Sequence, residues 1–484
     1  MSDVLTAFGL IAVVLAVAAL TSGLVARAPV SSPMIFLALG FLLGEHGLGW
    51  VRIGAHSAAL EVVAILSLSF VLFLDAVNLR FDELGNAWIV PVLALGPGTL
   101  LTVLLIGGAG ALLLALPPVQ ALLLGAILSS VDPVVLRDVV HDKRIPRSVR
   151  RALQTEAGTN DLVVLPIILV LATVARGELG STADWLMLLG RLFVLGPLVG
   201  LAVGAVAVWL MRQARAYTPI SNEYRALYGV GTLLAAYVAG EAAGGSGFLA
   251  VFAAGAAIVA LDYDICDCFL DFGAITSELV MLLAFILFGA MLSTAISAAP
   301  LLPTLLFAVI VLAVARPAAI SLVLWRAPIS GRGRRFIGWF GPRGLSSLLF
   351  ALLLVTKDVP GADLLLGLAG VVVIVSVIAH GVTAAPLAER YARAVREATL
   401  AEEREATAAG LFRKRPGAVP RISPEELAAR LASDAPPLVL DVRSRSSYAH
   451  DRARIPGDVR VPPDEVTEWA ARASRERPVV TYCT

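Results

Sequence analysis

The chain has 484 residues, of which 58% are hydrophobic and only 15% are charged. Soluble domains carry about 25% charged residues, so this composition excludes an ordinary soluble protein and indicates one embedded in a bilayer. The net charge is +1 and no basic face is evident, which excludes a nucleic-acid-binding role.

Apolar stretches follow one another from the N-terminus to about residue 388. A membrane-spanning helix needs about 20 mostly apolar residues. Thirteen stretches are predicted to span, at 4–26, 33–48, 58–78, 87–114, 119–136, 148–174, 183–211, 223–242, 247–261, 272–297, 300–324, 334–356 and 362–386. The first is interpreted as a retained helix, because no basic segment precedes it and no clear cleavage site follows it.

Arginine and lysine gather in alternate loops, which predicts the orientation in the cell membrane. The largest group lies between the fifth and sixth spans, at Arg137, Lys143, Arg144, Arg147, Arg150 and Arg151. Because basic loops stay in the cytoplasm, we expect the N-terminus outside and the C-terminal tail in the cytoplasm. The loop at 262–271 is the exception. It is acidic and holds Cys266 and Cys268, whose spacing is weak evidence for a metal site, so neither a metal nor a cofactor is predicted.

Two of the predicted spans are interrupted at their centres. Asp132-Pro133 lies in the span at 119–136, and Gly341-Pro342-Arg343-Gly344 lies in the span at 334–356. Irregular backbone inside a membrane is tolerated only where it is buried in protein or lines a cavity. If the seventh span joins two six-helix halves, both breaks lie in the fifth helix of a half, a pattern typical of transporter binding sites. Asp132 would then offset positive helix ends, and Arg343 negative ones.

Charged residues inside the sixth span need partners, since an ionisable group in a membrane costs several kcal/mol. Glu156 and Asp161 are five residues apart and point to different sides of a helix. Glu156 is expected to pair with Arg316 of the eleventh span. Asp161 has no evident basic partner, so it would hold either a proton or a small cation, which is the minimal requirement of an antiporter. His380, in the last span, would either sense pH or bond a backbone carbonyl.

Taken in order, these residues resemble the NhaP-like monovalent cation:proton antiporters of the sodium/proton exchanger family, over roughly residues 1–390. The matching segments are Asp132-Pro133, Glu156 with Asn160-Asp161, Arg316-Pro317 and Gly341-Pro342-Arg343-Gly344, and Asp75 matches the family's acidic site on the third span.

The resemblance implies an all-α polytopic membrane protein with two inverted repeats, crossed broken helices and a homodimeric assembly. It implies that Asp161 binds cation and proton in turn, supported by Asn160, and that Glu156 and Arg316 form a structural ion pair. Asn160 stands where electrogenic relatives have a second aspartate, which implies electroneutral exchange of Na⁺, Li⁺ or K⁺ for H⁺ in pH and ion homeostasis. Ala157 replaces a frequent serine, so Thr159 or Ser130 is expected to supply the hydroxyl.

The sequence becomes polar after the transport domain expected at 1–388. A charged, alanine-rich helical linker is predicted at 389–421 and a partial α/β domain at 422–484. Ser423, Pro424 and Glu426 favour a helix start. Asp441-Val442-Arg443, Ala453-Arg454-Ile455-Pro456-Gly457 and Tyr482-Cys483 resemble a rhodanese domain. The expected domain is incomplete, since the sequence ends one residue after Cys483, and we predict that it is inactive.

Two other functions compete with the antiporter. One is a membrane-anchored sulfurtransferase or rhodanese-type sensor, but thirteen spans with buried charges far exceed what an anchor needs. The other is a cation channel, which needs a continuous polar path where a carrier needs one occluded site. The sequence therefore favours a secondary transporter, which is not an enzyme.

Overall fold

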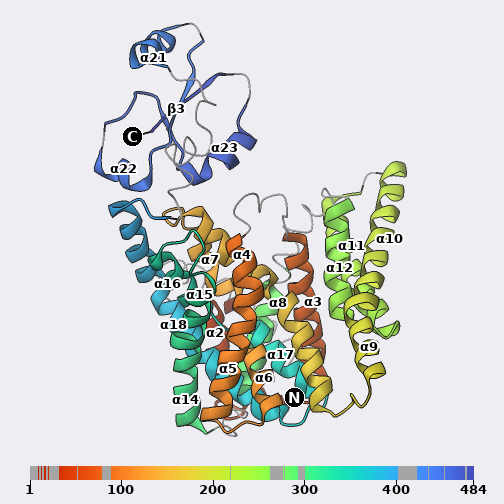
Figure 1. Ribbon diagram of the computed structural model, residues 1–484. Helices are drawn as coiled ribbons and strands as arrows, with labels where there is room; N and C mark the ends of the chain where they lie inside the picture. The colour runs from red at the N-terminus through yellow and green to blue at the C-terminus, as the bar shows by residue number, and fades with distance from the viewer. Residues whose placement is uncertain are drawn as a thin grey trace.

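The computed structural model describes residues 32–78, 89–261, 278–292, 300–401 and 422–483, apart from 52, 219, 434, 452, 475 and 476, together with 276 and isolated residues between 9 and 20. Most of the predicted first span and the whole Cys266–Cys268 pair lie outside the described residues. The described chain forms a bundle of long helices and, beyond one end of it, a small α/β domain at the C-terminus, which we call the tail domain (Figure 1).

The bundle is the all-α polytopic membrane fold that the sequence predicts. Its α-helices are α2 (Ser32–Leu43), α3 (Ala58–Asn78), α4 (Ile89–Leu93), α5 (Thr99–Leu113), α6 (Pro118–Ile127), α7 (Pro133–His141), α8 (Arg147–Ala175), α9 (Thr182–Gly190), α10 (Gly196–Tyr217), α11 (Asn222–Ala242), α12 (Gly247–Leu261), an apolar helix at Glu278–Leu292, α14 (Leu301–Ile310), α15 (Arg316–Val323), α16 (Gly331–Trp339), α17 (Leu345–Thr356) and α18 (Ala362–Glu397).

Among the described residues, 6 helical stretches are long and apolar enough to cross a membrane, and shorter apolar helices accompany them. The predicted spans agree with the helices to within a few residues at most ends. The two interrupted spans are each divided into two helices, α6 with α7 and α16 with α17.

In the described part of the chain, three long membrane helices each contain one π turn, and each turn lies at a proline. These turns are η2 (Ala94–Gly98), which contains Pro97, η3 (Arg191–Leu195), two residues before Pro197, and η5 (Val311–Ala315), two residues before Pro317. Proline has no backbone donor and crowds the preceding turn. A widened turn accommodates both effects, so the helix continues across the membrane instead of breaking.

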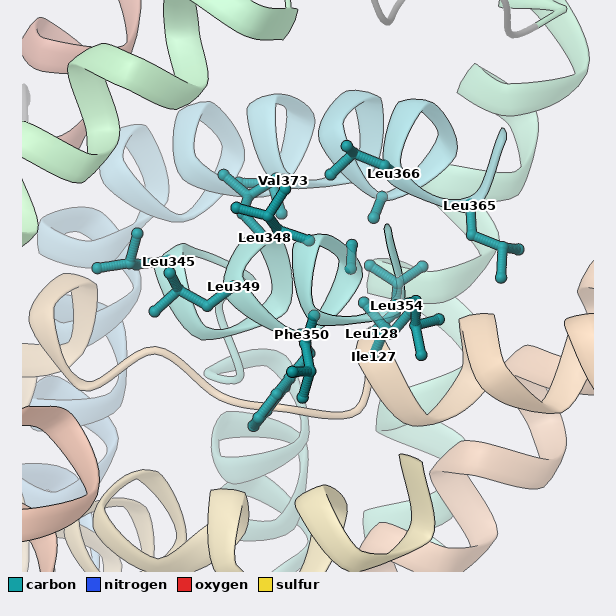
Figure 2. Packing of buried hydrophobic residues seen from close by; sticks show 14 of the residues in the cluster. Ile127, Leu128, Leu345, Leu348, Leu349, Phe350, Leu354, Leu365, Leu366 and Val373 are labelled. Atoms are coloured by element: carbon teal, nitrogen blue, oxygen red, sulfur yellow. The ribbon is translucent and has the colours of Figure 1, made fainter. Parts of the chain in front are cut away.

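The centre of the bundle is formed by α17 and the helices around it. All residues of α17 from Leu345 to Val355 are buried, as expected for a helix that is apolar on every face. Figure 2 shows its leucines packed between the end of α6 at Ile127 and Leu128 and the helix α18 at Leu365, Leu366 and Val373. This packing holds the two interrupted helices in fixed positions.

The tail domain has a three-stranded parallel sheet in the order β2-β1-β3. Its elements are α21 (Pro424–Leu431), β1 (Leu438–Asp441), α22 (Arg445–His450), β2 (Val459–Arg460), η6 (Pro463–Glu465), α23 (Val466–Arg472) and β3 (Val479–Tyr482). Leu440 lies opposite Val459 on one side and Thr481 on the other, and it belongs to a small core with Val442 and Val461. Ser423 caps α21 by accepting a hydrogen bond from the Glu426 amide.

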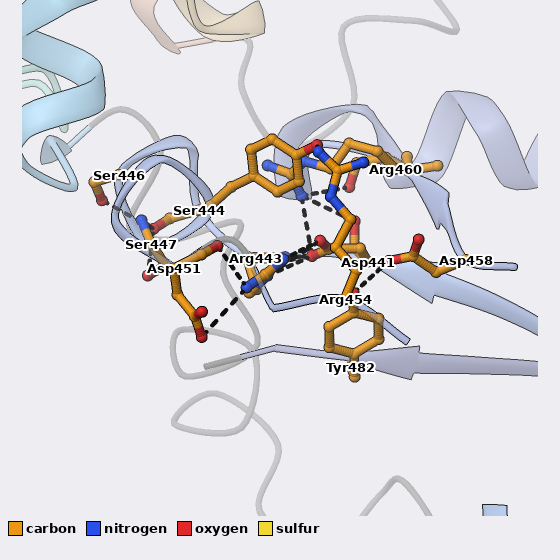
Figure 3. A network of polar contacts seen from close by, with 12 residues as sticks. Asp441, Arg443, Ser444, Ser446, Ser447, Asp451, Arg454, Asp458, Arg460 and Tyr482 are labelled. Carbon is orange, nitrogen blue, oxygen red and sulfur yellow. Dashed lines mark hydrogen bonds and ion pairs between the residues drawn. The ribbon is translucent and has the colours of Figure 1, made fainter. Parts of the chain in front are cut away.

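The Asp441-Val442-Arg443 motif forms a buried ion pair at the end of β1. Nη2 of Arg443 lies 2.7 Å from Oδ2 of Asp441, and both side chains are at most 1% exposed (Figure 3). Arg443 also donates to the Asp451 carbonyl at 3.2 Å. Burial acts to raise the pKa of Asp441, but the hydrogen bonds from Arg443 outweigh it and hold the pKa below its ordinary value.

The predicted linker begins as part of a membrane helix. α18 continues without a break to Glu397, whereas the linker was expected to start at residue 389. Residues 402–421 of that linker lie outside the described residues. The linker residues up to Glu397 are therefore an extension of α18.

Candidate ion-binding site

The two interrupted helices meet at their breaks. The segment between α6 and α7 and the segment between α16 and α17 are joined where the Asp132 amide donates to the Pro342 carbonyl at 2.9 Å. Pro133 is the first residue of α7, a position at which its missing donor leaves no intrahelical hydrogen bond unmade. The breaks therefore form a crossing of four half-helix ends inside the bundle.

Each break carries a charged side chain that binds a half-helix end at the other break. Oδ2 of Asp132 accepts a hydrogen bond from the Leu345 amide at 2.8 Å, at the first turn of α17. Nη1 of Arg343 donates to the carbonyls of Ser129 at 3.0 Å and Ser130 at 2.8 Å, just beyond the end of α6. The negative charge thus lies at a positive helix end and the positive charge at a negative one, which is the arrangement that the sequence predicts.

Glycine is required at two positions of the second break because side chains from other helices fill the space. A Cβ atom on Gly344 would overlap the carboxylate of Asp132, and one on Gly341 would overlap the guanidinium of Arg316. The Gly341-Pro342-Arg343-Gly344 motif therefore combines the break itself with room for the two charged groups that reach it.

Asp161 lies on α8 beside this crossing and is 2% exposed. The Ser130 hydroxyl donates to its Oδ1 at 2.5 Å, and the Ser346 hydroxyl is a second hydrogen-bond partner. Across the described ranges, no lysine, arginine or histidine forms an ion pair with Asp161. Among the described residues, the hydrogen-bond partners of this buried carboxylate are hydroxyl groups.

Further oxygen atoms near Asp161 lack donors. Asn160 donates through Nδ2 to the Ser129 carbonyl at 3.0 Å, but its Oδ1 is buried without a hydrogen-bond partner in the described part of the chain. Oδ2 of Asp75 is likewise buried without a partner among those residues, and its Oδ1 faces α8 at Gly158. The carboxylates of Asp75, Asp132 and Asp161 lie within electrostatic reach of one another. Oxygen atoms of this kind are ligands that hard cations prefer.

Glu156 and Arg316 form a bidentate ion pair, as the sequence predicts. Nη1 and Nη2 of Arg316 lie 2.6 and 2.9 Å from the two carboxylate oxygens of Glu156. Arg316 also donates to the Phe340 carbonyl at 3.3 Å, so the pair connects α8 and α15 to the second break. Glu156 is thereby neutralised, and Asp161 remains the unpaired acid of α8.

Residues 12–390 match the family model described as sodium/hydrogen exchanger, transmembrane. The chain belongs to this exchanger family. The rhodanese resemblance of the tail stays a prediction.

Curated relatives agree with this assignment and are transporters, not enzymes. The exchanger is 29% identical to the K(+)/H(+) antiporter NhaP of Alkalimonas amylolytica over 73% of this chain and 61% of the relative. It is 30% identical to the K(+)/H(+) antiporter NhaP2 of Shewanella sp. strain ANA-3, over 80% of this chain and 68% of that one. A Na(+)/H(+) antiporter NhaG of Bacillus atrophaeus is 26% identical over 62% of the chain and 58% of the relative. The exchanger thus spans about 60 to 70% of the length of these relatives.

A solved structure shares the fold. The sodium proton antiporter MjNhaP1 from Methanocaldococcus jannaschii, at pH 8, superposes with a TM-score of 0.65 at 22% identity. The match covers 80% of this chain and 99% of MjNhaP1.

The structure places the two candidate hydroxyl ligands differently. Thr159 was a candidate for a hydroxyl ligand, but its hydroxyl donates to the Thr155 carbonyl of its own helix at 2.6 Å. Ser130, the other candidate, contacts Asp161. Ser346 was missed, because a serine in an apolar helix carries little information by itself. A signal was present: a Ser-Ser pair adjoins each break, at Ser129-Ser130 and at Ser346-Ser347.

Both ring nitrogens of His380 lie within hydrogen-bond distance of backbone carbonyl groups, which is the second of the two predicted roles. Its Nε2 lies 2.9 Å from the Trp339 carbonyl, and its Nδ1 lies 2.8 Å from the Ser376 carbonyl. Ser376 in turn accepts a hydrogen bond from the Arg343 amide at 2.7 Å. His380 therefore ties α18 to the second break.

Within the described ranges, no group of three or more His, Cys, Asp and Glu side chains is arranged to hold a metal ion. Cys483 is exposed and is a free thiol.

Proposed function

We propose that this protein exchanges a monovalent cation for a proton across the cell membrane, with Asp161 as the shared binding group. The observation that carries the proposal is a buried carboxylate at the crossing of two broken helices, with hydroxyl partners and, in the part of the chain that the structure describes, no basic one. An isolated anion in such a place is unstable unless something positive neutralises it. A proton or a small cation can do this, and only one of them at a time.

Exclusive occupancy couples the two fluxes. When Asp161 is protonated, its carboxyl group no longer offers an anionic ligand, so the cation leaves. When the cation is bound, the proton is displaced. If the site opens to either side only when it is neutral, each cycle moves one cation one way and one proton the other.

The neighbouring groups support cation binding at Asp161. Oδ1 of Asn160 and Oδ2 of Asp75 are buried oxygens without donors in the described structure, so a desolvated cation could use them as ligands. Asp132 is occupied at the start of α17, and it contributes charge to the site rather than a freely moving ligand. Ser130 would both orient Asp161 and offer its own oxygen.

We propose that the exchange is electroneutral. Asn160 precedes Asp161 in the sequence and carries no charge, and Glu156 is neutralised by Arg316. Asp161 is then the acidic residue of α8 that binds the cation and the proton in turn, so one positive charge moves in each direction.

The cation is proposed to be an alkali ion. Two of the relatives are named for K⁺ and one for Na⁺, so these two ions are tested first, followed by Li⁺. We further propose a role in pH and ion homeostasis, a homodimer, an N-terminus outside the cell and a cytoplasmic tail. The basic loop before α8 and the arginines around α16 lie at the tail's end of the bundle, which supports this orientation.

The division of the chain into domains is also a proposal. The transport domain would occupy 1–388 and the rhodanese-like domain 422–484. A sulfurtransferase activity would require the Cys483 thiol, whereas cation exchange at Asp161 would not. We therefore expect Cys483→Ser to exchange cations at the normal rate.

The proposal is tested in proteoliposomes that hold a pH-sensitive dye. Addition of K⁺, Na⁺ or Li⁺ outside should change the internal pH with the wild-type chain and not with Asp161→Asn. Asp363→Asn is the matched control, because Asp363 is 70% exposed at the start of α18 and should retain exchange. Full activity of Asp161→Asn would refute the assignment of the site. A turnover rate that changes strongly with an imposed membrane potential would refute electroneutrality.

A further inference from the structure

The helix that carries Asp161 begins without a cap of its own. Pro146 precedes α8 as its N-cap residue and has no side chain that can accept a hydrogen bond from the first turn. The Arg147 amide instead donates to Oδ2 of Asp464 at 2.6 Å, although the two residues are 317 positions apart. The tail domain therefore supplies the missing cap, with a carboxylate at the positive end of the helix dipole.

Asp464 is held in place by Arg445 of its own domain, and this arginine also reaches across the boundary. Arg445 of α22 lies 2.7 Å from Oδ1 of Asp464, with side chains only 9% and 6% exposed. The same arginine donates to the Lys143 carbonyl, in the loop before α8, at 3.3 Å. The cap is thus part of a buried network and not a loose surface contact.

Two more ion pairs surround this network. Nη2 of Arg150 lies 2.8 Å from Glu465, and both side chains are less than 20% exposed. Nη2 of Arg147 lies 3.2 Å from Glu468. The acidic edge formed by Asp464, Glu465 and Glu468 therefore matches the basic start of α8 in charge and position.

The tail domain also contacts the end of α18. The Thr399 hydroxyl, two residues beyond that helix, lies 3.1 Å from the Ser444 hydroxyl and 2.6 Å from that of Ser446. One small domain consequently bridges the start of α8 and the end of α18. The domain also contacts the loop between α7 and α8. Asp132 directly precedes α7, and Asp161 lies on α8.

We propose that the tail domain is a built-in brake on exchange. Alternating access requires the helices around Asp161 to change their arrangement, and a domain that bonds two of them together stabilises the present one. Release of the acidic edge from α8 should lower the barrier and speed the cycle. This inference rests on the proposed function, since it concerns the rate of the same exchange.

The test uses charge reversal in the full chain. Glu465→Arg and Arg150→Glu each place like charges at the contact, and the double variant E465R/R150E restores opposite charges. The matched control is Glu426→Arg, which breaks an ion pair with Arg430 inside α21 that is about half exposed and not at this boundary. Each variant is measured for exchange in proteoliposomes and, by mass spectrometry, for hydrogen exchange of residues 143–151.

We expect both single variants to lose amide protection at 143–151 and to exchange cations about fivefold faster, the factor that corresponds to about 1 kcal/mol for the loss of a helix cap. The double variant should return both readouts to the wild-type values, and Glu426→Arg should change neither. Unchanged protection in the single variants would overturn the docking contact, and lost protection with unchanged or slower exchange would overturn the brake. Failure of the proposed function is distinguishable, because the wild-type chain would then show no exchange while its amide protection still responded to the charge reversals.

Discussion

The crossing of the broken helices and the boundary with the tail domain share one structural feature, a carboxylate at the N-terminus of a helix. At each, a carboxylate binds the first amides of a helix: Asp132 binds α17 and Asp464 binds α8. At the crossing, the partners lie inside the bundle, so loss of the contact would leave a charge in a nonpolar surrounding. At the boundary, flanking pairs such as Arg150 with Glu465 reach water, so separation allows the charges to hydrate. A charge at a helix end therefore fixes the structure at the crossing and permits a reversible contact at the boundary.

The greatest loss of stability is expected from the buried ion pair of the membrane domain, Glu156 with Arg316. Glu156→Gln leaves the guanidinium of Arg316, which is 2% exposed, without its anion. Removal of one partner of a buried ion pair costs about 3–5 kcal/mol. We expect a correspondingly lower melting temperature of the purified chain, measured by the fluorescence of its tryptophans.

The double variant Glu156→Leu with Arg316→Met provides the control for that prediction. It replaces both charges by apolar groups, so it should recover most of the lost stability. If the single and double variants were equally unstable, the cost would not come from an unpaired charge.

The next effect is steric and tests the rigidity of the crossing. Gly344→Ala places a methyl group on the carboxylate of Asp132 and should destabilise the membrane domain by about 3 kcal/mol. Gly108→Ala on α5 is the matched control, because a Cβ atom there meets nothing within 4 Å. The yield of monodisperse protein in size-exclusion chromatography should fall for the first variant alone. Equal yields would mean that the crossing adapts more easily than its geometry implies.

The crossing could be predicted from the sequence, and the boundary could not. Asp132, Arg343 and Arg316 stand out because charges, prolines and glycines are rare inside apolar spans, so each one demands a partner. The ends of the spans also follow from hydropathy, as at Ala58–Asn78 and Arg147–Ala175. Ser346 was missed because its hydroxyl needs no such explanation, and the direction of Thr159 depends on a rotamer. The Asp464 cap joins residues 317 positions apart, and exposed acids and arginines occur in any polar tail.

The smallest effect belongs to the tail domain and depends on pH. The folded-state pKa of Asp441 lies below its ordinary value of 3.8, because hydrogen bonds from Arg443 exceed the opposing effect of burial. The ion pair therefore stabilises the folded tail above pH 3.8 and loses this contribution as the pH falls through the lower, folded-state pKa. Pepsin should cleave the tail of the full chain faster as the pH is lowered from about 4 toward about 2, which is roughly the range in which a carboxyl group with a lowered pKa is protonated. The rate is corrected for pepsin's own pH dependence, measured on an unfolded substrate. Asp441→Asn should remove this pH dependence, and a variant with the wild-type profile would show that another group is responsible.

The competition of cation and proton for Asp161 can be measured directly as proton release. The purified chain is held in weakly buffered detergent solution near neutral pH, and the pH is followed on addition of K⁺ or Na⁺. Choline, a much bulkier cation than an alkali ion, serves as the control for ionic strength. The account predicts release of protons by the wild-type chain, to a limit of about one per chain, and none by Asp161→Asn. Equal proton release by the two chains would show that cation and proton do not compete at Asp161.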